Sequence, residues 1–109
     1  MFVNMEIQQV HIPEEALEAL CKKWQIVELA IFGSALGDNF RADSDLDVLV
    51  EFEEKAAISL FDHIKIKEEL EDIIGREVDL VTRRSVEDSY NWIRRKSILD
   101  SARTVYEAG

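Results

Sequence analysis

The chain contains little cysteine, proline or glycine, with one, one and four of these residues among 109. Its single cysteine, Cys21, cannot form a disulfide within the chain. This excludes a small secreted scaffold held together by disulfides and favours the reducing cytoplasm. Long apolar runs are also missing. None approaches the ~20 residues that a membrane-spanning helix needs, so we expect no membrane partner.

Positive charge is scarce as well. Thirteen Lys and Arg residues oppose 23 Asp and Glu residues, which gives a formal net charge of −10. Such a surface repels phosphate backbones, so we expect no direct nucleic-acid binding. A phosphate group can bind only where metal cations or a local basic cluster offset this charge. With 47% hydrophobic residues, the length predicts one domain over residues 1–109.

Hydrophobic periodicity divides the chain into helices and strands. Pro13 suits the first turn of a helix, and Ser59 with Asp62 forms a capping-box pattern before a helix that ends at Gly75. In chain order the sequence predicts a helix over about 13–24, strands over 26–32 and 45–52, a helix over 59–75, a strand over 77–82, one or two helical pieces from 85 onward, and a short strand over 103–106. The predicted fold class is α/β (α+β), with a small mixed β-sheet flanked by helices.

Asp45 and Asp47 lie two residues apart in the clearest predicted strand, where Leu46, Val48 and Val50 alternate with them. Because alternate residues of a strand share a face, both carboxylates project from the same side, about 6–7 Å apart along the strand. Two ionised carboxylates repel each other, and a hard divalent cation relieves that repulsion. Mg²⁺ commonly binds one or two carboxylates together with substrate phosphates. The alternative is that both acids line a solvated strand face.

Asp79 and the Gly33-Ser34 pair extend this pattern. Asp79 lies between Val78 and Leu80 in an apolar run, where an acid needs a partner. If its strand neighbours the strand of Asp45 and Asp47, it completes a cluster of three carboxylates; an acid on an edge strand is the alternative. Gly33 and Ser34 follow an apolar strand, where a glycine permits close backbone approach and N–H groups with a hydroxyl suit a phosphate. A simple turn with a capping serine is the alternative for this pair.

The order and spacing of these parts resemble a known family. Gly33-Ser34, ten further residues and then Asp45-x-Asp47 form the signature of the DNA polymerase beta-like nucleotidyltransferases. The chain is similar to the minimal nucleotidyltransferase (MNT) domains of that superfamily, in the form that acts as the antitoxin of MNT/HEPN toxin–antitoxin pairs. The segments that carry the resemblance are residues 31–52, 76–84 and 93–106.

This resemblance implies a role for six residues. The family fold arranges acids around two Mg²⁺ ions, for which Mn²⁺ can substitute, and the catalytic and metal-binding residues here would be Asp45, Asp47 and Asp79. ATP is the implied substrate, and the residues that bind its triphosphate would be Gly33, Ser34 and Arg41. The implied reaction attaches a nucleoside monophosphate to an acceptor and releases pyrophosphate.

The acceptor is expected to be presented by another molecule, because 109 residues leave no room for the helical substrate domain of larger relatives. The resemblance implies a HEPN-domain toxin as the partner, with a hydroxyl, expected to be that of a tyrosine, as the AMP acceptor. The charge of −10 suits contact with a basic, RNA-binding toxin surface. Homo- and hetero-oligomers both remain open.

A second hypothesis is an antitoxin that neutralises its toxin by binding alone, with the acids catalytically silent. The three acids favour catalysis, because a silent domain has no need to keep repelling carboxylates together. Gly37 weakly favours the silent alternative, since relatives often carry a basic residue in that loop. A third hypothesis, a transferase for small molecules of the aminoglycoside type, is disfavoured by the absent acceptor domain.

Overall fold

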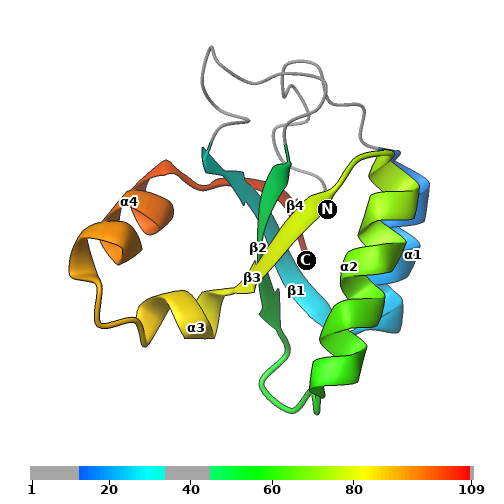
Figure 1. Cartoon of the computed structure of the whole chain (residues 1–109). Coiled ribbons are helices and arrows are strands. Elements are labelled where there is room, and N and C mark those ends of the chain that lie inside the picture. The colour runs from blue at the N-terminus through cyan, green and yellow to red at the C-terminus, as the bar shows by residue number, and fades with distance from the viewer. Residues whose placement is uncertain (1–12, 34–44, 109) are drawn as a thin grey trace.

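A computed structural model describes residues 13–33 and 45–108 of the chain. Its elements are α1 (Glu14–Lys23), β1 (Ile26–Phe32), β2 (Leu46–Phe52), α2 (Leu60–Ile74), β3 (Val78–Thr82), α3 (Arg83–Glu87), α4 (Trp92–Ser101) and β4 (Arg103–Glu107). The strands form one sheet in the order β3-β2-β1-β4. β1 is antiparallel to β2 and β4, whereas β2 and β3 run parallel. The predicted mixed sheet with flanking helices is confirmed (Figure 1).

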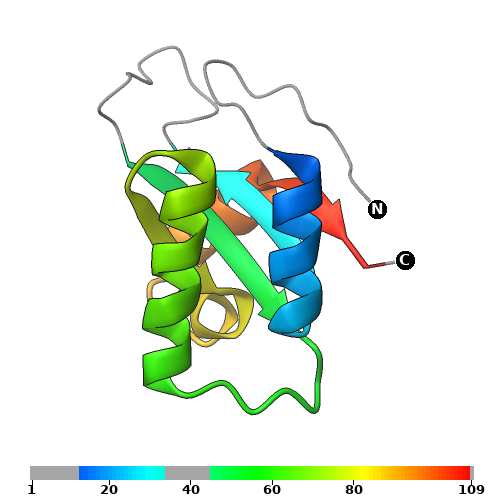
Figure 2. The ribbon, with the colours of Figure 1, turned by 90° about the vertical axis from the view of Figure 1, so that its right-hand side faces the viewer.

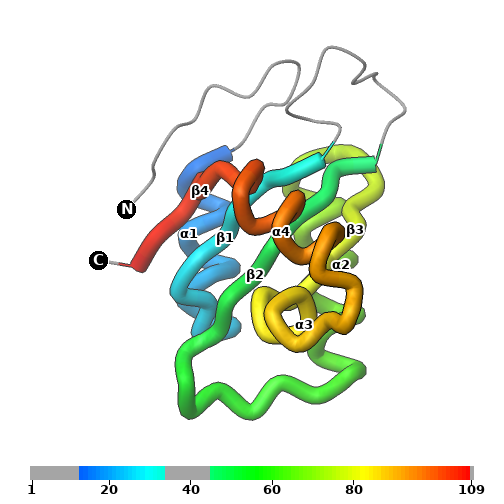
Figure 3. Tube along the Cα trace, turned by 90° about the vertical axis from the view of Figure 1, so that its left-hand side faces the viewer, coloured from blue at the N-terminus to red at the C-terminus, as the bar shows by residue number. Residues whose placement is uncertain are grey.

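The sheet lies between two pairs of helices. α1 and α2 cover one face (Figure 2), and α3 and α4 cover the other (Figure 3). Alternate residues of β2 pack into different cores: Leu46, Val48 and Val50 pack on the α1–α2 side, and Leu49 packs with Val86 and Ile98 on the α3–α4 side. This confirms the alternation that the sequence predicts. It also puts Asp47 on the α3–α4 face, because Asp47 and Leu49 are two residues apart.

The helix ends follow from local capping. The side chain of Ser59 accepts a hydrogen bond from the Asp62 N–H, and the Asp62 carboxylate accepts one from the Ser59 N–H, both at 3.1 Å. Gly75 ends α2 with a φ of 83°. The region predicted as helical from 85 onward begins two residues earlier, because Thr82 caps α3 through the Ser85 N–H. Asn91 caps α4, so this region forms two helices.

Glu28 is the polar residue within the otherwise apolar β1, and it links three elements. Arg83 of α3 donates a hydrogen bond to its carboxylate at 3.0 Å, and Thr104 of β4 donates another at 2.6 Å. Both carboxylate oxygens are therefore partnered, which offsets the cost of partial burial. The same contacts fix α3 and β4 relative to the centre of the sheet.

Cys21 is buried in the larger core, and burial raises the pKa of its thiol to about 12. The thiol therefore stays protonated, as expected of an inert core cysteine. Within residues 13–33 and 45–108, none of the helices combines the length and the apolar character that crossing a bilayer requires.

Glu71, near the end of α2, fixes the start of β3. Its carboxylate accepts a hydrogen bond from the Val78 N–H at 2.9 Å and another from the Lys67 ammonium at 3.2 Å. The hydrogen bond from Val78, followed by that from Lys67, lowers the pKa of Glu71 below its ordinary value. Because β3 begins at Val78, this carboxylate also sets the position of Asp79.

The variant Glu71→Gln keeps the size of the side chain and removes its charge. Since the folded-state pKa is lowered, the ionised carboxylate stabilises the fold above the pKa of an unfolded glutamate, and this stabilisation is lost as the pH falls through the folded value. We expect a loss of about 1 kcal/mol at pH 7 and a smaller loss at pH ~3, below the ordinary pKa of glutamate. Urea unfolding at both pH values measures it, with Glu68→Gln at an exposed position of α2 as the control. An equal loss at both pH values would contradict the assignment.

Candidate active site

Four of the six predicted site residues, Gly33, Asp45, Asp47 and Asp79, lie at the end of the sheet where β1 ends and β2 and β3 begin (top of the sheet in Figure 1). We call this end of the sheet the acidic edge. Gly33 directly follows β1, and Asp45 directly precedes β2. Asp47 is paired in register with Phe32 of β1 and with Asp79 of β3. Because adjacent strands are about 4.8 Å apart, Asp47 and Asp79 are immediate neighbours on the same face of the sheet.

Gly33 packs directly against the carboxyl group of Asp47. Its φ of 75° lies in the left-handed region, which side chains other than glycine rarely adopt. A Cβ added there would overlap the Asp47 Oδ2 atom and lie 3.2 Å from its Cγ atom. Both the conformation and the space therefore require glycine, as the sequence predicts for a close backbone approach.

The three acids differ in exposure. Asp45 and Asp79 are exposed, and Asp47 is half-buried. The expectation that Asp79 needs a partner because of its apolar neighbours is wrong. β3 is an edge strand, and Asp79 faces solvent while Val78 and Leu80 are buried on the opposite face. The alternative considered for Asp79, an acid on an edge strand, describes its position correctly.

The fit of a metal ion depends on these carboxylates. Among the residues that the structure describes, no three His, Cys, Asp or Glu side chains are grouped so that they could hold a metal ion. Asp47 and Asp79 nevertheless offer hard oxygen donors at neighbouring register positions. Mg²⁺ needs only one or two carboxylates when phosphates and water complete its shell. The pair therefore fits a metal that arrives with a nucleotide, and the predicted two-ion, three-acid centre stays a prediction.

The two remaining predicted nucleotide-binding residues, Ser34 and Arg41, lie outside the described residues, as does Gly37. Their contact with a triphosphate stays a prediction.

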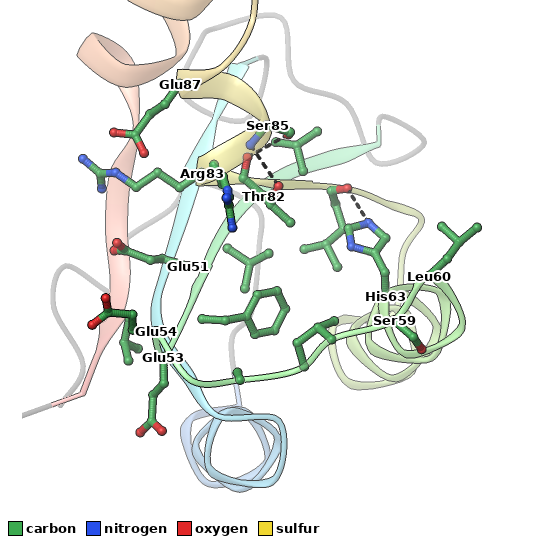
Figure 4. Close-up of a pocket in the computed structure, with 18 residues that line it drawn as sticks. Glu51, Glu53, Glu54, Ser59, Leu60, His63, Thr82, Arg83, Ser85 and Glu87 are labelled. Atoms are coloured by element: carbon green, nitrogen blue, oxygen red, sulfur yellow. Dashed lines mark hydrogen bonds between the residues drawn. The ribbon is translucent and has the colours of Figure 1, made fainter.

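A groove at the opposite end of the sheet was not predicted from the sequence. It lies between the ends of β2 and β3, the segment 53–59, the start of α2, and α3 (Figure 4). His63 is half-buried there, and its Nε2 atom lies 3.0 Å from the Leu80 carbonyl oxygen. No local motif marks this groove, because its lining comes from three separate parts of the chain: Val27, residues between 50 and 63, and residues between 80 and 87.

Comparison with known proteins identifies relatives in sequence. The family model described as "Nucleotidyltransferase domain" matches residues 13–105. Over 68 residues the chain is 35% identical to MJ1379 of Methanocaldococcus jannaschii, a candidate protein adenylyltransferase, and the match covers 62% of this chain and 68% of that one. Over 67 residues it is 38% identical to the protein adenylyltransferase MntA of Thermococcus cleftensis, with 62% and 66% covered.

Solved structures agree with this comparison. The structure of a candidate minimal nucleotidyltransferase is 37% identical, superimposes with a TM-score of 0.62, and is matched over 82% of this chain and 85% of that one. A toxin–antitoxin complex with AMP-PNP superimposes with a TM-score of 0.66 at 16% identity, over 89% of this chain and 75% of that one. At that identity the second likeness shows the fold alone.

The chain therefore belongs to the nucleotidyltransferase domain family and is an enzyme of that class. Within the class it is similar to a candidate minimal nucleotidyltransferase, and protein adenylyltransferases are among its relatives. The glycine and the paired acids at the edge of the sheet carry the same signature by which the sequence resembles this family.

The variant Gly33→Ala tests whether the glycine positions Asp47. Its matched control is Gly75→Ala, because Gly75 also has a positive φ, of 83°, but an added Cβ there meets nothing within 4 Å. We expect both variants to lose about 1 kcal/mol of stability from the left-handed conformation. Only Gly33→Ala should also lose nucleotide binding, because its Cβ displaces the Asp47 carboxyl group. Thermal unfolding and calorimetric titration with ATP and Mg²⁺ measure the two effects. Equal nucleotide affinity in both variants would refute this role of Gly33.

Proposed function

We propose that this enzyme transfers AMP from ATP to a hydroxyl group, that of a tyrosine, on a HEPN-type toxin and thereby acts as its antitoxin. The observation that carries the proposal is the register pairing of Asp47 with Asp79 beside Gly33, in a chain of the nucleotidyltransferase family. We further infer that the reaction depends on Mg²⁺ and takes place in the reducing cytoplasm.

Each residue at the edge has a part in the proposed reaction. The acceptor oxygen attacks the α-phosphorus of ATP, an O–P bond forms, and the bond to the β-phosphate oxygen breaks as pyrophosphate leaves. Asp45, Asp47 and Asp79 would hold the metal, which when bound neutralises phosphate charge in the transition state. Asp79, which is exposed beside Asp47, would accept the proton of the attacking hydroxyl. The Gly33 N–H and the Ser34 hydroxyl would orient the triphosphate.

The nature of the acceptor follows from the relatives. Sequence relatives are named as protein adenylyltransferases, which supports a protein as acceptor. Two solved neighbours with the same fold are toxin–antitoxin complexes, one of them with AMP-PNP and one named MntA-HpeT. Together with the charge of −10, which complements a basic surface, these relatives support a toxin as the partner and an adenosine nucleotide as the donor.

The alternative is a catalytically silent antitoxin that acts by complex formation. One observation favours it: the described residues contain no ready-made group of three metal ligands. The alternative predicts that neutralisation survives the loss of every acid at the edge, whereas the enzymatic proposal predicts that it does not.

Incubation with a HEPN-type toxin as the proposed partner, ATP and Mg²⁺ tests the proposal. We expect intact-mass spectrometry to show one or more added adenylyl groups on the toxin, and none when EDTA is present. Asp45→Asn and Asp79→Asn should each lower the rate by at least about 100-fold, because lost charge stabilisation in a transition state has effects of this size.

Asp88→Asn is the control, because Asp88 is an exposed acid at the end of α3, away from the edge. It should modify the toxin as wild type does. A toxin that stays unmodified but is neutralised equally by wild type and Asp45→Asn would overturn the enzymatic proposal and support the silent antitoxin.

A further inference from the structure

The groove at the opposite end of the sheet has features of a docking site. It encloses a volume of about 1070 Å³ and lies at the ends of β2 and β3, whereas the candidate active site lies at their beginnings. From Asp47 to Phe52 the strand rises about 16 Å, so a molecule bound in the groove leaves the acidic edge free. We propose that this groove docks an amphipathic helical segment of a partner protein, one with apolar side chains flanked by Lys or Arg.

Apolar side chains line the groove and continue onto its rim. Phe52 and Ile58 are half-buried in it and pack against the larger core. Leu60, which lines the groove in the first turn of α2, is 76% exposed. Phe61 and Ile64 lie outside the lining on the same helix and are 79% and 44% exposed. Three large apolar residues exposed on one helix beside an apolar hollow are typical of an interaction surface. They provide the contact for the apolar stripe of a helix.

One wall of the groove is acidic. Glu51, Glu53, Glu54 and Glu87 line it, and in Figure 4 Glu51, Glu53 and Glu54 lie on the side opposite Leu60. Within the described part of the chain, none of these four forms an ion pair. Their charge is therefore available to Lys or Arg side chains of a partner.

The arginines of the groove do not cancel this charge. Arg83 pairs with Glu28 at 3.0 Å, which lies outside the acidic wall. Arg84 is highly exposed and lies 4.0 Å from Asp88, on its own helix. The groove therefore keeps an excess of negative charge, which selects a cationic partner and repels the phosphates of nucleic acid.

The groove is also held in a fixed shape. The capping box of Ser59 and Asp62 sets the start of α2, and His63 holds that helix to the Leu80 carbonyl oxygen at 3.0 Å. A preformed groove loses little conformational freedom on binding. A second copy of this chain suits it poorly, because each copy carries a net charge of −10.

If the partner is the toxin of the proposed function, this groove is where the toxin docks while its hydroxyl reaches the acidic edge. The inference rests on the proposed function only for the identity of the partner as the toxin. Its test therefore uses neither ATP nor the toxin, so that each proposal can fail independently of the other.

Two synthetic helical peptides of about 18 residues, or five turns, serve as probes. They share one leucine stripe, and its flanking residues are lysines in one peptide and glutamates in the other. We expect only the lysine peptide to bind the full chain, with amide NMR shifts confined to residues 51–64 and 80–87. Leu60→Asp and the double variant Glu53→Lys/Glu54→Lys should each weaken binding about tenfold or more, as for central contacts of an interface.

Trp92→Asp is the matched control, because Trp92 is a large apolar residue, 61% exposed, at the start of α4 and outside the groove. It should bind the lysine peptide with wild-type affinity. No binding of that peptide, equal binding of both peptides, unchanged affinity in Leu60→Asp, or shifts spread over the acidic surface would each overturn the proposal. A wild-type dimer in sedimentation that Leu60→Asp dissociates would instead assign the groove to a second copy.

Discussion

The candidate active site depends on the contact between Gly33 and the carboxyl group of Asp47. This contact exists because β2 lies at the centre of two different pairings, antiparallel with β1 and parallel with β3. The carboxyl end of β1 therefore meets the amino ends of β2 and β3 at one edge. A parallel β1 would carry Gly33 to the far end of the sheet. If β3 were antiparallel to β2, the start of β3 and with it Asp79 would lie at the opposite end of the sheet from Asp47.

The two faces of the sheet differ in what they carry, and so do its two ends. The face toward α1 and α2 carries most of the apolar core, and Asp47 lies on the opposite face. Glu28, with Arg83 and Thr104, fixes the elements that cover this second face. The acids lie at one end of β2 and the apolar groove at the other. This separation keeps the candidate active site and the proposed docking groove from overlapping.

The sequence predicts the fold well where the information is local. The alternation of Leu46, Val48 and Val50, the capping box at Ser59 and the stop at Gly75 act over a few residues, and the structure confirms each of them. The start of α3 was placed two residues late because the cap is Thr82, a residue that also ends β3.

Features that depend on distant parts of the chain were predicted less well. The pairing of Asp47 with Asp79 could be stated only on the condition that their strands are neighbours, and the exposure of Asp79 depends on β3 being an edge strand. The groove was missed because its residues come from between Val27 and Glu87, and no periodicity connects them. Resemblance to a family supplied the roles of the acids, which their spacing alone leaves open.

We propose that a metal–nucleotide complex binds where Gly33, Asp47 and Asp79 meet. Paramagnetic broadening by Mn²⁺ in the presence of ATP tests it most directly, because the broadening falls steeply with distance and needs no acceptor protein. We expect the amide signals of these three residues to disappear first, while those of Phe52 and Thr82 at the other end of the sheet persist. Broadening centred on Glu51, Glu53 and Glu54, or spread evenly over the acidic surface, would contradict it.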